Sequence, residues 1–85
     1  MSMDKSQIRD ALVGVVNEHL KNHATNPDFK SGLTSENWTR VISGCKSLTE
    51  QTGTIAKKLG IKAPADLKQF ATLDDAVDYC IKNQQ

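Results

Sequence analysis

The amino-acid sequence predicts a small all-α protein, a four-helix bundle that forms one domain over residues 1–85. Three observations favour this class. In four segments the apolar residues recur every three or four positions, which places them on one face of a helix. Residues typical of helix ends flank these segments. No segment alternates strictly between apolar and polar residues, as a half-buried strand would.

The first helix is expected over residues 4–21, with Asp4 or Ser6 as its N-terminal cap. The stretch that follows, through Gly32, is rich in turn-forming residues, and we expect Phe29 to attach it to the core. The predicted buried face of the helix consists of Ile8, Leu12, Val15, Val16 and His19.

The second helix is expected to begin after a cap at Thr34, where Leu33 and Trp38 would form a hydrophobic staple. Gly44 indicates that this helix ends close to residue 44, because glycine weakens a helix interior. The predicted apolar face contains Trp38, Val41, Ile42 and Cys45.

A third helix is predicted from Leu48 to Leu59. Ser47 and Glu50 have the spacing of a capping box, in which the serine hydroxyl accepts a hydrogen bond from the Glu50 amide. Gly60 suits the position after the last turn, and Pro64 reinforces the end of the helix.

The last helix has the clearest pattern. Thr72 and Asp75 resemble a capping box with Asp in place of Glu, and a short turn over Ala65 to Phe70 leads into it. Its predicted buried stripe consists of Leu73, Ala76, Val77, Cys80 and Ile81.

The composition narrows the class of function. The chain is 38% hydrophobic and 25% charged, which fits a folded globular protein and neither a disordered chain nor a membrane protein. No apolar run approaches the ~20 residues that span a bilayer, and the N-terminus lacks the apolar core of a signal peptide. We therefore expect a cytoplasmic location. The net charge of +1 gives no basic surplus, so nucleic acid is not the expected partner.

Candidate catalytic or metal-binding residues are few. His19 and His23 have the i, i+4 spacing of two metal ligands, but a structural site normally needs four, so no metal is predicted. Cys45 and Cys80 are expected to be buried thiols without a disulfide. No histidine lies near Cys45 in the local sequence, so catalysis by this thiol is not expected.

Residues 52–69 allow a second interpretation, a helix-turn-helix that binds DNA. Ala56, Gly60 and Ile61 suit that motif, and nearby lysines would contact phosphates. Pro64 opposes it, because proline falls where the recognition helix would be forming.

Three segments together resemble the acyl carrier protein family. GCKSL at 44–48 is similar to the family motif G-x-D-S-L, LGIKAPADLKQFATLDDAVDYCIKN at 59–83 is similar to its C-terminal half, and IRDALVGVVNEHL at 8–20 is similar to its first helix. The resemblance implies a four-helix bundle with a short third helix. It also implies that Ser47 carries a covalent phosphopantetheine arm derived from coenzyme A.

The resemblance further implies a carrier of acyl or aminoacyl thioesters, as in fatty acid or polyketide biosynthesis, that is not itself an enzyme. Its partners would be a phosphopantetheinyl transferase and the enzymes that load and transfer acyl groups. Lys46 stands where the family has an acidic residue, which marks an atypical member. The alternative is a non-enzymatic protein-interaction module on the same fold, in which Ser47 is only a helix cap.

Overall fold

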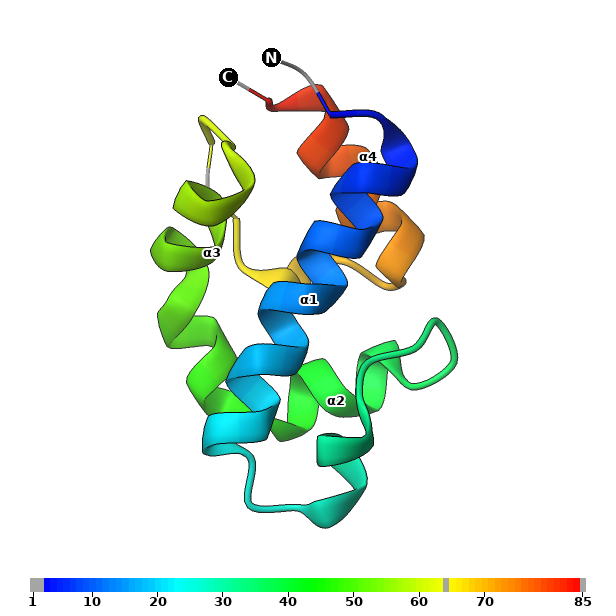
Figure 1. Cartoon of the computed structure of the whole chain (residues 1–85), viewed down its shortest axis with the longest axis vertical. Coiled ribbons are helices and arrows are strands. Elements are labelled where there is room, and N and C mark those ends of the chain that lie inside the picture. The colour runs from blue at the N-terminus through cyan, green and yellow to red at the C-terminus, as the bar shows by residue number, and fades with distance from the viewer. Residues whose placement is uncertain (1–2, 64, 85) are drawn as a thin grey trace.

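The computed structural model describes residues 3–63 and 65–84, and this part of the chain is all-α, as predicted. Figure 1 shows α1 running the length of the molecule, with α3 and α4 beside it and α2 crossing near the far end from the two termini. The described elements are α1 (Lys5–His23), η1 (Pro27–Ser31), α2 (Trp38–Gly44), η2 (Lys46–Gln51), α3 (Thr52–Leu59), η3 (Leu67–Gln69) and α4 (Leu73–Lys82), where η denotes a 3₁₀-helix.

Helix α1 begins where the sequence predicts. Asp4 is its cap, and a capping box is complete because Asp4 accepts from the Gln7 amide while the Gln7 side chain accepts from the Asp4 amide. The helix continues to His23, two residues beyond the predicted end. Its buried face contacts α3 and α4 and consists of Ile8, Leu12, Val16 and Leu20.

The connection after α1 is attached to the core by Phe29, as predicted. Asn26 caps the short η1 by accepting from the Asp28 amide, and Phe29 within η1 is 6% exposed. Its ring lies so close to Gly44 that a Cβ at position 44 would come within 2.5 Å of Phe29 Cζ. The end of α2 therefore rests directly on the ring of Phe29.

Helix α2 begins at Trp38, four residues after the predicted cap at Thr34, so the predicted start is wrong. The reason is a closed turn: Thr34 Oγ1 accepts from the Asn37 amide, and Asn37 Oδ1 accepts from the Thr34 amide. These reciprocal bonds have the pattern of a capping box, but they enclose a turn. Trp38 is 1% exposed and donates from Nε1 to the Phe70 carbonyl at 2.9 Å.

The predicted third helix is divided into two parts. Residues Lys46–Gln51 form the 3₁₀-helix η2, and the α-helix α3 begins only at Thr52. Thr49 and Thr52 each donate their hydroxyl to the carbonyl three residues earlier, at 2.7 and 2.8 Å. Such local bonds compete with α-helical hydrogen bonding. Gly60 ends α3 with φ of 69°, as its predicted position requires, whereas Pro64 lies outside the described residues.

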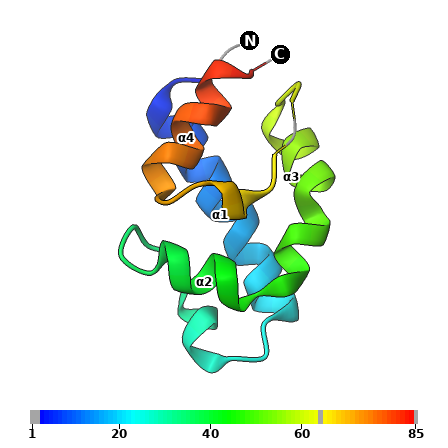
Figure 2. The same cartoon turned by 180° about the vertical axis from the view of Figure 1, so that it is seen from behind.

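Helix α4 is capped by Thr72, whose hydroxyl accepts from the Asp75 amide at 3.1 Å. Figure 2 shows the turn that contains η3 linking α3 to α4 in front of α1. The Gln84 side chain accepts from the Met3 amide at 2.6 Å and donates to the Met3 carbonyl at 2.9 Å. The two ends of the described chain are therefore joined. Within residues 3–63 and 65–84, no helix has the length and apolar character needed to cross a membrane.

Candidate functional site

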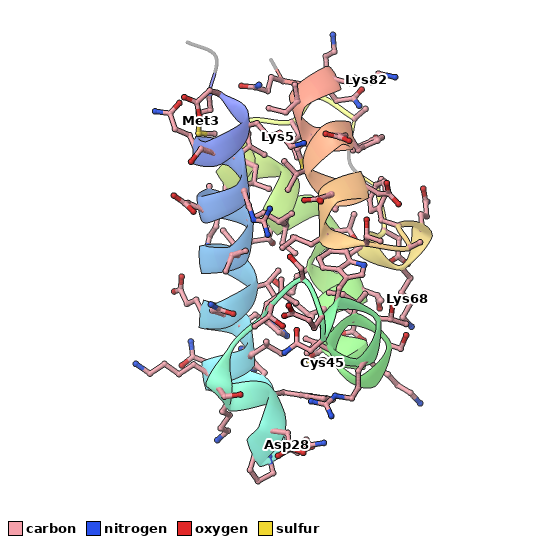
Figure 3. The ribbon with its side chains drawn as sticks, turned by 90° about the vertical axis from the view of Figure 1, so that its right-hand side faces the viewer. Met3, Lys5, Asp28, Cys45, Lys68 and Lys82 are labelled. Atoms are coloured by element: carbon pink, nitrogen blue, oxygen red, sulfur yellow. The ribbon has the colours of Figure 1, made fainter. Side chains whose placement is uncertain are left out.

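Ser47 lies in η2, beside the C-terminal half of α1. Figure 3 shows its neighbour Cys45 in the half of the molecule that also contains Asp28, away from Met3 and Lys82. Ser47 is half-buried, whereas the flanking Lys46 is exposed and Leu48 is buried in the core. The burial of Leu48 and Cys45 on either side of Ser47 fixes this part of the backbone.

The Ser47 hydroxyl does not cap a helix, so the predicted capping box with Glu50 is wrong. Ser47 Oγ lies 2.7 Å from His19 Nε2 and 3.4 Å from Cys45 Sγ, and no side chain caps η2. His19 belongs to α1, 28 residues earlier in the chain. The Ser47 hydroxyl therefore bonds to a distant residue, His19, in place of the Glu50 amide that the local sequence pattern predicted.

The surroundings of His19 favour its neutral form. Burial of the ring lowers the pKa of His19 below its ordinary value of 6.5, and the neighbouring His23 lowers this pKa further. The two rings are 4.6 Å apart between centroids and tilted by 32°. A neutral imidazole with its proton on Nδ1 has a free lone pair on Nε2, and that lone pair can accept the Ser47 hydrogen.

Two hollows flank this pair. An open hollow of about 530 Å³ borders Ser47, and its other lining residues are His23, Ala24, Thr25, Asn26, Phe29, Gly44, Cys45 and Lys46. A smaller one of about 150 Å³ borders His19 and reaches Glu18 on α1 and Lys58 on α3. Solvent can thus reach Ser47 from the larger hollow and His19 from the smaller one.

The other candidate residues show no further chemistry. His19 Nε2 is engaged by Ser47, and the described ranges hold no group of three or more His, Cys, Asp or Glu side chains arranged to bind a metal. Cys45 and Cys80 are free and buried, in agreement with the sequence, and burial raises the pKa of Cys80 to about 11. An exposed reactive thiolate is therefore not formed at Cys80 near neutral pH.

The segment expected for a helix-turn-helix contains one α-helix. After α3, the three-residue η3 is the only helical element among the described residues between 60 and 69. A recognition helix that enters a major groove needs several turns of regular helix. This part of the chain therefore does not provide the second helix of the motif.

The surface of η2 and α3 is basic. Lys46, Lys57 and Lys58 are exposed, and Glu50 is the single exposed acidic residue of residues 46–59. Lys58 lies 3.9 Å from Glu18 in a contact open to solvent. Because solvent weakens such contacts, Lys58 keeps most of its influence on the surrounding potential.

The Ser47–His19 pair is the feature that sequence reasoning missed. The available signal was the position of His19 on the predicted buried face of the first helix, since a buried polar side chain needs a partner. Comparisons of the chain with models of protein families, with curated proteins and with solved structures found no significant match.

Proposed function

We propose that the protein is an atypical carrier that bears a phosphopantetheine arm on Ser47 and passes acyl or aminoacyl thioesters between partner enzymes. The observation that carries the proposal is the setting of Ser47 in GCKSL. Its half-buried hydroxyl opens onto a hollow of about 530 Å³ near the start of the helical stretch formed by η2 and α3. A carrier requires one reachable hydroxyl on a rigid support, and Ser47 has both properties.

The residues around Ser47 fit such an arm. The Ser47 hydroxyl would hold it through a phosphodiester, and the exposed ammonium of Lys46 offers opposite charge to a phosphate. The His19 ring beside Ser47 is a hydrogen-bonding group that faces the same oxygen. When bound, the arm supplies a thiol that carries the acyl group as a thioester. The chain itself then positions the arm and presents a surface to its partners.

The basic surface of η2 and α3 points to the kind of partner. Carrier proteins of the family that this chain resembles present acidic helices to basic enzymes. Here Lys46, Lys57 and Lys58 make the corresponding surface positively charged. Complementary charge mainly governs association rate and partner choice. We therefore propose a transferase and acyl-transferring enzymes with acidic or neutral docking faces, acting in the cytoplasm, where coenzyme A is available.

The proposal is tested by intact-mass spectrometry of the full chain after incubation with coenzyme A and each of several phosphopantetheinyl transferases. We expect a gain of one phosphopantetheine that is lost in Ser47→Ala and kept in Ser43→Ala, a matched change at an exposed serine of α2. If every transferase fails, or the gain persists in Ser47→Ala, the carrier function is wrong.

The hydrogen bond between Ser47 and His19 favours a second candidate, a non-enzymatic interaction module in which Ser47 is purely structural. In that case Ser47→Ala leaves His19 without its 2.7 Å partner and lowers the free energy of unfolding by ~1 kcal/mol, with no modification lost. Urea denaturation of both serine variants, combined with the mass measurement, separates the two functions.

A further inference from the structure

The pairing of a serine hydroxyl with a neutral imidazole has a chemical consequence that a carrier does not need. We propose that Ser47 and His19 form a nucleophile–base pair through which the unmodified protein acylates itself on Ser47 with a small activated ester or thioester. The proposal is independent of the carrier function, which requires only that another enzyme reach Ser47.

The first support is geometry. The 2.7 Å between Ser47 Oγ and His19 Nε2 lies within the range over which a general base takes a hydroxyl proton. The two side chains come from different elements, η2 and α1, and both are half-buried. Because buried neighbours such as Leu20 and Leu48 fix both backbones, the pair is held in place before any substrate arrives.

The second support is direction. Cys45 Sγ lies 3.4 Å from Ser47 Oγ, and a thiol can donate to a hydroxyl oxygen. With the thiol as donor to Oγ, the Ser47 hydrogen points to His19 Nε2. This chain of bonds orients the hydroxyl for loss of its proton to the base.

The third support is space. The hollow beside Ser47 has Ala24, Phe29 and Gly44 among its walls and the ammonium of Lys46 at its edge. Its volume of about 530 Å³ accommodates a short acyl group with its leaving group. The walls are partly apolar and the edge is cationic, which suits a short acyl chain and an oxyanion that develops during attack.

The charged groups facing His19 set the pH range of the reaction. On α1 these are His23 and Glu18, on α3 Lys58, and beyond Ser47 on η2 Lys46. Lys58 Nζ and Glu18 Oε2 lie 3.9 Å apart in a contact open to solvent. Among the described residues no carboxylate is bonded to the His19 ring, and the lowered pKa of His19 favours a neutral imidazole whose Nε2 can accept a proton.

The reaction balances without any further reagent. Ser47 Oγ attacks the carbonyl carbon of the ester while its proton moves to His19 Nε2. The bond from that carbon to the leaving oxygen or sulfur breaks, and the leaving group takes the proton from His19. The products are Ser47 esterified with the acyl group and one free alcohol or thiol. No atom is oxidised or reduced.

The test uses the full unmodified chain with p-nitrophenyl acetate. We measure p-nitrophenolate release and map acetyl groups by peptide mass spectrometry after acid quenching, with hydroxylamine to separate a labile Ser47 ester from a stable Lys46 amide. We expect Ser47-dependent release that disappears in Ser47→Ala. His19→Gln, which keeps a polar group but not the base, should slow it by about 100-fold or more. Ser43→Ala, a change at an exposed serine of α2 that lines neither hollow, should keep the rate within a few-fold.

The pH profile of the wild-type protein provides a second measurement that needs no variant. The rate should rise with pH along a single titration centred below 6.5 and then level off. The proposal is overturned by absence of acetyl on Ser47, by an unchanged rate in a folded His19→Gln, or by a rate that follows hydroxide without levelling. Acylation of Ser47 without phosphopantetheine transfer would refute the carrier function and leave the nucleophile–base pair standing. Phosphopantetheine transfer without acylation of Ser47 would refute the nucleophile–base pair and leave the carrier function standing.

Discussion

Replacing Gly44 by alanine should destabilise the protein, although the same change elsewhere should stabilise it. Gly44 is the last residue of α2, and its Cα faces the ring of Phe29. An added Cβ would lie 2.5 Å from Phe29 Cζ and 2.7 Å from Cε2. Gly53, in the first turn of α3, has no atom within 4 Å of the corresponding position. The two glycines therefore form a matched pair.

Two effects of opposite sign decide the result at Gly44. Alanine favours a helix over glycine by up to ~1 kcal/mol. Overpacking of a well-filled site costs ~1–3 kcal/mol, and Phe29 is only 6% exposed, so moving its ring disturbs the packing that buries it. We expect Gly44→Ala to lose ~1 kcal/mol or more, and Gly53→Ala to gain ~0.5–1 kcal/mol.

Thermal and urea unfolding followed by far-UV circular dichroism measure both changes, and each kcal/mol shifts the midpoint of a domain of this size by ~4–8 °C. Phe29→Leu replaces the ring with a shorter side chain. The loss of stability caused by Gly44→Ala should therefore be smaller when Phe29→Leu is also present. If Gly44→Ala is as stable as the wild type, or if its cost is unchanged beside Phe29→Leu, the proposed steric contact is wrong.

Three further predictions follow from caps and titrations. Thr72→Ala removes the acceptor for the Asp75 amide and should cost ~1 kcal/mol in urea unfolding, whereas Thr72→Ser should cost much less. NMR titration should give His19 a pKa below 6.5. The free energy of unfolding should fall as pH drops from neutral through that pKa, because the unfolded chain binds the proton more readily. The His19→Gln variant should lack this pH dependence. The Cys80 pKa of about 11 exceeds the unfolded value of 9.0, so stability present below pH 9.0 should decline by on the order of 2 kcal/mol towards pH 11. An unchanged decline in Cys80→Ala would contradict that assignment.

The fold follows from local signals where a cap and an apolar face agree. Asp4 and Thr72 are both predicted caps that the structure confirms, and Gly60 ends α3 in the left-handed conformation expected of glycine. The predicted cap at Thr34 is wrong because Thr34 and Asn37 exchange hydrogen bonds within a closed turn. A capping pattern alone does not distinguish a turn from a helix start, since both satisfy the same amide.

The candidate site was predictable in identity but not in environment. The motif GCKSL selects Ser47, and its role as an attachment site stays a prediction. Its partner His19 lies 28 residues away, and only the packing of α1 against η2 brings the two together. Periodicity places His19 on a buried face, but it cannot say which element faces that position. The same limit applies to the basic surface of η2 and α3. The sequence shows that its net charge is positive, but it does not identify the partners that this surface would bind.

The two hydrogen bonds between the Gln84 side chain and the Met3 backbone have a practical consequence for protein engineering. They hold the two ends of the described chain together, in the half of the molecule away from Cys45. A short flexible linker joining those ends should permit a circular permutant, opened at the exposed Thr25 and Asn26 instead. Such a permutant would place new termini beside the hollow at Ser47, so that a fluorophore or a fused peptide could report directly on what binds there.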